Sequence, residues 1–187
     1  KYPWAKSLYR LMIGNFWIPE KVSGLKDDAR MFHLDLSPDE QRAYKGIISF
    51  LTFLDSIQTV NLPHFADYIT SPEVSMLLAI QAYQEAIHSQ SYATILETVV
   101  ESKEREEIYY LWRSDKILFE RNKFIGQIYQ DFMDNPSDKN LFRGIIANFL
   151  LESIYFYNGF AFFDQNFATS GGCNISGSKP SDDARDE

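Results

Sequence analysis

Three side chains suited to metal-binding or redox chemistry, Glu85, His88 and Tyr92, are spaced three and four residues apart. On an α-helix this spacing puts a carboxylate, an imidazole and a phenol on one face. Leu78 and Ile95 extend the same face in both directions, so it is otherwise apolar and predicts a stripe directed at a protein core. A single Glu-x-x-His pair also occurs on solvated helices or around one core histidine, so a metal site needs further ligands.

Two more carboxylates lie on stripes that are otherwise apolar. Asp55 follows Leu51 by four residues, and a lone buried aspartate costs several kcal/mol unless a cation or hydrogen bonds compensate. An off-centre Asp55 that reaches solvent is an equal alternative. Glu152 has no obvious route to water, which favours a buried functional carboxylate. The other members of its expected inward stripe are Ile145, Phe149, Phe156 and Phe160.

Inward carboxylates on three different helices make one another more plausible as a metal site. Buried together without a cation they would repel and raise each other's pKa, and two divalent ions remove that problem. Glu187 is available as a fourth carboxylate. Mixed oxygen and nitrogen ligands suit iron or manganese. The pattern predicts an all-α, ferritin-like helical bundle with a dinuclear metal site in its core.

Serine and proline signals divide the chain into helices. Ser37-Pro38 with Glu40 forms a capping box, Ser71-Pro72 repeats the start, and Ser137 opens another helix. Pro63 is expected to end or bend the first of these, and the segment through Asp35, with His33, is expected to connect helices as a loop. The expected helical stretches are about 1–15, 38–63, 72–100, 117–134 and 138–167, with a charged amphipathic segment at 101–114. The bundle is expected over 1–168, followed over 169–187 by a Gly/Ser-rich loop and the start of the fourth ligand-bearing helix.

Composition limits the classes of function. The chain has 187 residues and a formal net charge of −8, which argues against a nucleic-acid or anionic-membrane surface. No run of eighteen apolar residues and no signal peptide are present, so a cytoplasmic protein is expected. The single cysteine, Cys173, rules out an internal disulfide and a multi-cysteine metal site.

Five sequence segments together resemble a known family. They are FWIPE at 16–20, LDSIQ at 54–58, EAIHSQSY at 85–92, LESIYFYNGF at 151–160 and RDE at 185–187. In this order and close to this spacing they are similar to the small, radical-generating subunit of class I ribonucleotide reductase. The resemblance covers roughly residues 1–168 continuously.

The resemblance implies a role for each matching residue. Tyr92 would be oxidised to a stable radical, inside an apolar pocket that includes Phe156 and Phe160. Trp17 and Asp186 would work with the metal-bound histidine in proton-coupled electron transfer to the large subunit. The implied ligands of a dinuclear iron or manganese centre are Asp55, Glu85, His88, Glu152 and Glu187.

The resemblance also implies partners. The large catalytic subunit would receive the oxidising equivalent and reduce ribonucleotides to deoxyribonucleotides, and the small subunit would form a homodimer. A manganese-loaded centre would need a flavodoxin-like activator, whereas an iron-loaded one would react directly with O₂.

The likeness breaks down near the end of the sequence. The family's second Glu-x-x-His would place a sixth ligand at position 190, beyond residue 187, and residues 169–184 form a Gly/Ser-rich stretch where the family continues into a helix. The family's C-terminal docking tail is also missing. These departures predict a truncated or split chain that assembles a complete metal centre poorly and is inactive or impaired as a 187-residue fragment.

Other functions fit parts of the pattern. A ferritin-like, ligand-binding metal oxidase would use a related metal pair. A non-catalytic helical interaction protein would instead satisfy Asp55 and Glu152 with buried Arg or Lys side chains. A storage cage leaves Trp17 unexplained, and Cys173 lacks a nearby histidine for nucleophilic catalysis.

Overall fold

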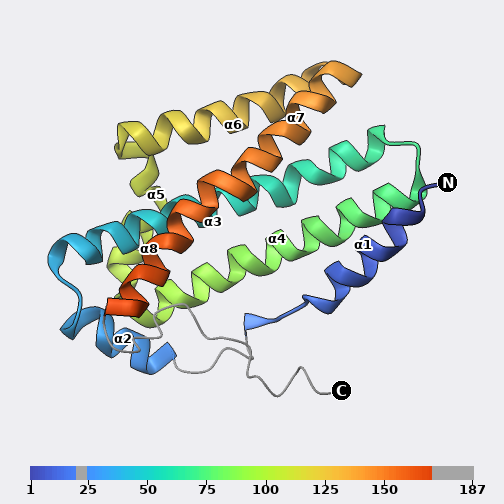
Figure 1. The fold of residues 1–187 in the computed structure, drawn as a ribbon. Helices are drawn as coiled ribbons and strands as arrows, with labels where there is room; N and C mark the ends of the chain where they lie inside the picture. The colour runs from blue at the N-terminus through green and yellow to red at the C-terminus, as the bar shows by residue number, and fades with distance from the viewer. Residues whose placement is uncertain (20–24, 170–187) are drawn as a thin grey trace.

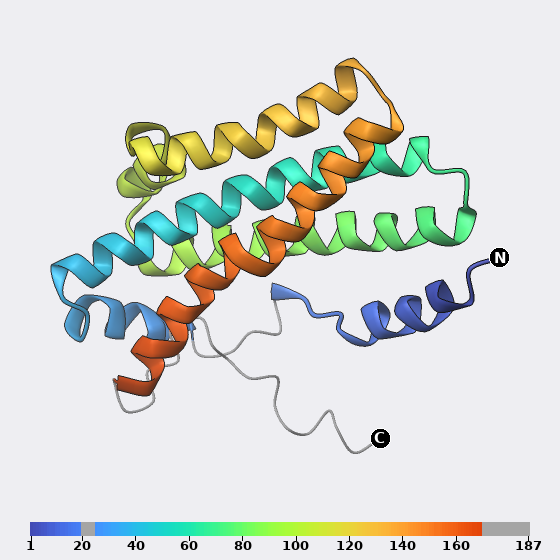
Figure 2. The ribbon, with the colours of Figure 1, turned by 45° about the horizontal axis from the view of Figure 1, so that its top comes forward.

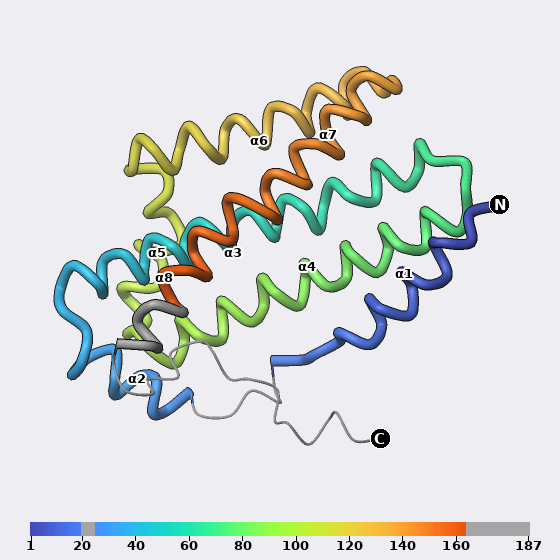
Figure 3. Tube along the Cα trace, viewed as in Figure 1, coloured from blue at the N-terminus to red at the C-terminus, as the bar shows by residue number. Residues whose placement is uncertain are grey.

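The computed structural model describes residues 1–19 and 25–169, with side chains described as far as residue 163. All the regular elements of these ranges are helices, as Figures 1 and 3 show. They are α1 (Pro3–Gly14), α2 (Leu25–Leu34), α3 (Pro38–Tyr68), α4 (Pro72–Val99), α5 (Ser102–Ser114), α6 (Lys116–Asp134), α7 (Asp138–Leu150), the π-helical segment η2 (Leu151–Tyr155) and α8 (Phe156–Thr169).

The long helices α3 and α4 form the centre of the bundle. They run side by side and make the most extensive helix pair of the described chain. Helix α1 packs along α4, while α6 packs against α3 and α7. The continuous rod α7–η2–α8 crosses α3 diagonally (Figure 2). The centre of the bundle is therefore lined by α3, α4 and this rod.

The start of α3 is fixed by the predicted capping box. The Ser37 side chain accepts a hydrogen bond from the Glu40 backbone N–H, and the Glu40 carboxylate accepts one from the Ser37 backbone N–H at 2.8 Å. Pro63 lies inside α3, which continues to Tyr68, so this proline does not end the helix. Ser71 does precede α4, but its hydroxyl donates to Glu73 instead of capping the helix backbone.

The prediction of a loop before Asp35 is wrong for most of the described residues in this segment. Residues Leu25–Leu34 form α2, with Asp27 and Asp28 in the first turn, where negative charge is favourable to a helix. Phe32 is buried, and His33 Nε2 lies 2.9 Å from the Val99 carbonyl oxygen. Packing of Phe32 into the core outweighs the loop signals around Pro19 and Gly24.

The expected inward stripe on α7, η2 and α8 is also largely wrong. Ile145, Phe149 and Phe160 are exposed, as is Glu152, and of the five expected residues Phe156 alone is buried. The buried positions of this rod are Gly144, Ala147, Leu151, Phe156 and Gly159. The five-residue step from Leu151 to Phe156 spans the π-helical segment, so a period of 3.6 residues does not describe this face.

Glycines bring the rod close to α3. A Cβ atom at Gly144 would lie 2.4 Å from the Phe65 ring, and one at Gly159 would lie 2.9 Å from Ile47 Cγ2. Such distances leave no room for a side chain. The close approach brings Asn148 and Glu152 within hydrogen-bonding distance of Gln58 on α3.

The opposite side of the rod is apolar and uncovered by described residues. It includes the exposed residues Phe142, Ile146, Phe149, Ile154 and Tyr157. By length and composition alone, the stretch Asp138–Phe163 could cross a membrane, with a mean hydropathy of 1.2. Leu151 and Phe156 belong to the main core, so this stretch has the contacts of a bundle helix along its other side.

Two apolar clusters form the core. The larger contains Leu51, Leu54, Phe65, Tyr129 and Phe156, and lies between α3, α6 and the α7–η2–α8 rod. The smaller lies near α2 and the ends of α3 and α4 that face it, and contains Phe32, Tyr44, Ile48 and Leu96. Tyr92 and Phe163 pack against both clusters.

Candidate metal centre

The centres of α3 and α4 bring two buried carboxylates and a histidine together. Asp55 is 1% exposed and Glu85 is 3% exposed. One ligand atom from each of Asp55, Glu85 and His88 lies within 4.8 Å of the others. The predicted convergence of these three side chains is therefore present.

The two carboxylates each carry a buried oxygen that is unsatisfied. Asp55 Oδ1 and Glu85 Oε2 have no hydrogen-bond partner among the described residues. His88 Nδ1 lies 3.4 Å from Glu85 Oε2, at the i,i+3 spacing. Buried polar oxygens are nearly always paired, and these two belong to side chains whose ligand atoms lie close to each other and to the imidazole of His88. This donor set fits divalent iron or manganese ions.

Glu152 joins the site from a different setting. Its residue lies on the exposed side of η2, but its Oε1 accepts a 2.5 Å hydrogen bond from Gln58 Nε2. Burial of the carboxyl group and the neighbouring Glu85 raise the pKa of Glu152 to about 8, against a lowering effect of the Gln58 hydrogen bond. The expectation that Glu152 has no route to water is wrong, because the side chain reaches inward from the surface.

The same crowding of carboxylates affects Asp55. Burial, and then the charges of Glu85 and Glu152, raise the pKa of Asp55 well above its usual value. The metal-free site thus retains protons that divalent cations would displace. Neither Asp55 nor Glu152 forms an ion pair with Lys or Arg in the described part of the chain, so the feature required of a simple interaction protein is missing there.

Tyr92 lies beside the carboxylates, one turn of α4 after His88. Burial raises the pKa of its phenol well above the usual value, and the charges of Asp55, Glu85 and Glu152 act in the same direction. The phenol is therefore protonated at neutral pH. Phe156 belongs to the core cluster against which Tyr92 packs, whereas Phe160 is 41% exposed.

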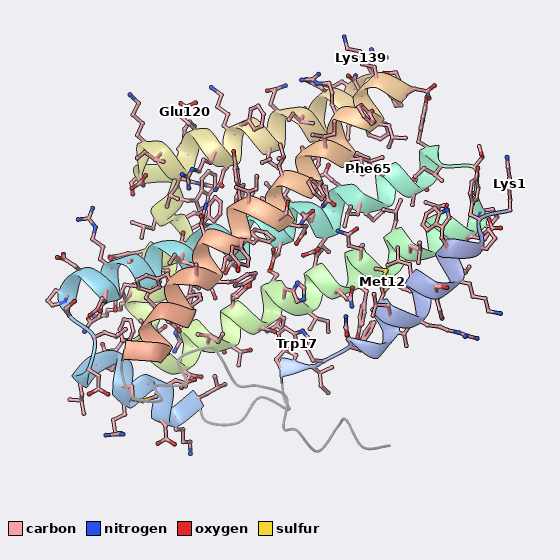
Figure 4. All side chains as sticks on the ribbon, viewed as in Figure 1. Lys1, Met12, Trp17, Phe65, Glu120 and Lys139 are labelled. Atoms are coloured by element: carbon pink, nitrogen blue, oxygen red, sulfur yellow. The ribbon has the colours of Figure 1, made fainter. Side chains whose placement is uncertain are left out.

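Trp17 lies against the other side of His88. The two rings stack with centroids 5.6 Å apart and an interplanar angle of 20°. Figure 4 shows Trp17 beyond the end of α1, beside the middle of α4. Gln84 donates to the Met12 carbonyl oxygen at 3.1 Å, which ties α1 to α4 next to Glu85. Trp17 is 42% exposed, so the stack is open to the surface.

Some predicted residues lie outside the described part of the chain. These are Asp186, Glu187 and Cys173, together with the predicted Gly/Ser-rich loop beyond Thr169, at which the described helix α8 ends. Three polar residues linked to Glu152 were missed: Gln58 donates a hydrogen bond to it, and Asn148 and Tyr129 donate to Gln58. Gln58 follows Asp55 by three residues and Asn148 precedes Glu152 by four, so helical spacing alone could have identified both.

Comparisons with known proteins agree with this arrangement. Residues 1–167 match the family model for the ribonucleotide reductase small chain. Ribonucleoside-diphosphate reductase subunit beta of Treponema pallidum is 50% identical over 163 residues, which make up 87% of this chain and 46% of the relative. The subunit of the same name from Aquifex aeolicus is 47% identical over 164 residues, or 87% of this chain and 23% of the relative.

A solved structure supports the same conclusion. The ribonucleotide reductase R2 subunit from Clostridium botulinum superposes with a TM-score of 0.87 and 50% identity, over 94% of this chain and 54% of that one. The chain thus spans about half of that structure and half or less of the two curated relatives. The predicted all-α, ferritin-like fold and the predicted family are both confirmed. The chain belongs to the ribonucleotide reductase small chain family.

Proposed function

We propose that this protein acts as the small subunit of a ribonucleoside-diphosphate reductase and generates the radical on which reduction of ribonucleotides to deoxyribonucleotides depends. The observation that carries the proposal is the pair of unsatisfied buried oxygens of Asp55 and Glu85, next to His88 and Tyr92. The names of the two curated relatives support the same activity. A ligand-binding metal oxidase remains the alternative within this fold.

The proposed metal ligands are carboxylates and an imidazole from α3, α4 and η2, of which Asp55, Glu85 and His88 have ligand atoms close to one another. They are Asp55, Glu85, His88 and Glu152, together with Glu187, which lies outside the described residues. When bound, a pair of iron or manganese ions supplies the oxidising power for a one-electron oxidation of a nearby phenol. Oxygen and nitrogen ligands accept either metal.

Tyr92 is the proposed radical residue. Its raised pKa keeps the phenol protonated, so loss of an electron must be accompanied by loss of the phenolic proton. Packing of the partly buried ring against both core clusters limits the access of water and reductants. Phe156 supports this apolar setting, and we propose that Phe160 completes it in the assembled protein.

Trp17 and His88 form the proposed exit for the oxidising equivalent. Stacked rings whose centroids are 5.6 Å apart provide close contact for electron transfer, and the exposed indole is accessible to another protein. Asp186, outside the described residues, is proposed to complete the route. The proposed recipient is the large catalytic subunit, with the small subunit as a homodimer in the cytoplasm. A flavodoxin-like activator belongs to the proposal for a manganese-loaded centre.

The test loads the whole protein with iron(II) and O₂, or with manganese(II) and a flavodoxin-like activator. We expect two metal ions per chain, a tyrosyl signal by electron paramagnetic resonance, and ribonucleotide reduction with the large subunit. Tyr92→Phe should keep the metal and lose the signal, whereas Asp55→Ala should lose both. A tyrosyl signal that persists in Tyr92→Phe contradicts the assignment of Tyr92, and a loaded protein without reductase activity favours the oxidase.

The 187-residue polypeptide makes a separate test of ligand number. Its described residues supply four of the proposed ligands, and we still predict that residues 1–187 by themselves load a complete dinuclear centre poorly. Metal analysis of this polypeptide beside the whole protein measures the difference. Full occupancy by two ions in the 187-residue polypeptide would contradict this prediction.

A further inference from the structure

Three side-chain amides form a continuous hydrogen-bonded chain that ends at Glu152. Gln81 Nε2 donates to Asn148 Oδ1 at 3.3 Å, Asn148 Nδ2 donates to Gln58 Oε1, and Gln58 Nε2 donates to Glu152 Oε1 at 2.5 Å. The amides come from α4, α7 and α3 in turn, so every bond joins two different helices. We name Gln81, Asn148 and Gln58 the amide chain.

The direction of the amide chain is set by its partners. Tyr129 donates its hydroxyl to Gln58 Oε1 at 3.4 Å, so this oxygen accepts two hydrogen bonds. A Gln58 amide turned by 180° would place its NH₂ group against the Asn148 NH₂ group and its oxygen against the Glu152 carboxylate. Both contacts would be between groups of the same hydrogen-bonding type. Each amide therefore donates towards Glu152.

The three carboxylates of the site differ in how they are held. Asp55 and Glu85 are buried between α3 and α4, so packing restricts their side chains. Glu152 comes from the exposed side of η2. Its side chain is long enough to extend into solvent instead of towards the site. Among the described residues, the interactions that draw its carboxyl group inward are the bond from Gln58 and a contact with Glu85. Glu85 is itself acidic and raises the pKa of Glu152, so of these two neighbours Gln58 is the one that donates a hydrogen bond from an uncharged group.

We infer that Gln58 and Asn148 are positioning residues for the metal centre: they hold Glu152 Oε1 as an acceptor and leave the other carboxylate oxygen for the metal ions. This inference rests on the proposed metal-binding function. Gln58 is fully buried and Tyr129 is 1% exposed, so the donor cannot be replaced readily by water. A hydrogen bond to a carboxylate is stronger than one between neutral groups, and it fixes the orientation of a ligand before the metal arrives.

The deciding variant is Asn148→Asp, because Asn148 forms hydrogen bonds with Gln81 and Gln58 and none with Glu152. An aspartate at this position has no NH₂ group, so Gln58 should turn its own NH₂ group towards it and present an oxygen to Glu152. Gln58→Met removes the donor directly and keeps the length of the side chain. Gln130→Met is the matched control, because Gln130 donates to the carboxylate of Asp134 at 2.8 Å on the exposed surface of α6.

The experiment titrates manganese(II) alone into the whole protein and records infrared difference spectra of the carboxylates. We expect Gln58→Met and Asn148→Asp to weaken binding of one of two manganese ions by about 10- to 100-fold, the usual effect of losing an outer hydrogen-bond partner of a ligand. Both variants should also shift the glutamate carboxylate band in protein labelled with ¹³C-glutamate, while Gln130→Met should do neither. Circular dichroism establishes whether each variant is folded. If Gln58→Met is unfolded, the result for Asn148→Asp decides the test.

Two outcomes overturn the inference in different ways. Wild-type affinity and an unchanged carboxylate band in folded Asn148→Asp would contradict it and leave the metal centre standing. A wild-type protein that binds no manganese would contradict the proposed function, and this inference with it.

Discussion

Two groups of buried polar side chains meet at α3, where Asp55 and Gln58 are one turn apart, and they differ in whether the protein satisfies them. Asp55 and Glu85 keep unsatisfied oxygens among the described residues, and burial among like charges raises the pKa of Asp55. Gln58 is equally buried, but both ends of its amide are hydrogen-bonded, to Glu152 on one side and to Asn148 and Tyr129 on the other. Among the described residues the first group is left incomplete, whereas the second is complete.

This difference predicts opposite effects of mutation in the metal-free protein. An unsatisfied buried carboxyl group must either carry a desolvated charge or take up a proton on folding, so replacing it by a neutral side chain should raise the free energy of unfolding. Removing an amide from a satisfied network leaves its partners unpaired, so it should lower the free energy of unfolding.

The largest expected effect is that of Asp55→Asn. The variant should lose manganese(II) affinity by more than about 100-fold, since it removes a proposed ligand and its charge. The metal-free variant should unfold with a free energy roughly 1–3 kcal/mol higher than wild type, because the buried Asp55 carboxyl group must take up a proton on folding or carry an unpaired charge, and an amide needs neither. Isothermal titration and denaturant unfolding measure the two quantities. If the metal-free variant is instead less stable than wild type, the Asp55 carboxyl group makes a stabilising interaction in the metal-free protein, contrary to this prediction.

A second prediction uses pH to separate the two groups. The pKa of Glu152 rises from 4.5 to about 8 on folding, so the folded metal-free protein binds more protons than the unfolded chain between these values. This contribution to stability is present below about pH 4.5 and is lost as the pH rises to about 8. Manganese displaces these protons, so its affinity should rise over the same window, by about tenfold per pH unit for each proton displaced.

The control for this pH dependence is Glu152→Gln, which cannot titrate. Its metal-free stability should vary less with pH across the window, while Asn148→Asp changes the amide network and leaves Glu152 able to titrate. Affinities that are independent of pH between 5 and 8 in the wild-type protein would show that the site binds metal without releasing protons.

The sequence was sufficient for the parts of the site that depend on regular helices. Asp55, Glu85 and His88 lie on uninterrupted stretches of α3 and α4, where a period of 3.6 residues relates sequence position to direction. Their convergence could therefore be predicted, as could the capping box of Ser37 and Glu40. Their role as ligands stays a prediction until metal is bound.

The other side of the site could not be predicted in the same way. The π-helical segment inserts a five-residue step between Leu151 and Phe156. A stripe counted back from buried Phe156 with a period of 3.6 residues therefore reaches Glu152 and Phe149, which are exposed. Gly144 and Gly159, on either side of this step, pack closely against Phe65 and Ile47 of α3, which are about eighty and more than a hundred positions away in the chain. The partners of Gln58 depend in turn on how close that packing is.

Gly144→Ala tests whether the close packing of α7 against α3 supports the amide chain. The new methyl group would meet the Phe65 ring at 2.4 Å, and overpacking of this kind costs about 1–3 kcal/mol of stability. The displaced α7 should also weaken the Asn148 to Gln58 bond, while Asp55 and Glu85 on α3 and α4 keep their places. Thermal unfolding measures the first effect and manganese titration the second.

Gly126→Ala is the matched control for this substitution. Gly126 lies in α6, and a Cβ atom there would meet nothing within 4 Å. This variant should keep or slightly raise the stability of the protein, because alanine favours a helix over glycine by about 1 kcal/mol. Equal stability of the two variants would mean that the Phe65 ring moves aside without loss, and that the approach of α7 is not limited by Gly144.

The smallest expected effect is that of Gln81→Met, at the outer end of the amide chain. Gln81 is half-buried and makes one 3.3 Å hydrogen bond to Asn148, so its loss should lower the free energy of unfolding by about 0.5–1 kcal/mol. The sign is opposite to that expected for Asp55→Asn. Asn148 keeps its bond to Gln58, so manganese affinity should fall less than in Asn148→Asp. A fall as large as in Asn148→Asp would mean that the orientation of Asn148 depends on Gln81 alone, and would extend the supporting structure of Glu152 to α4.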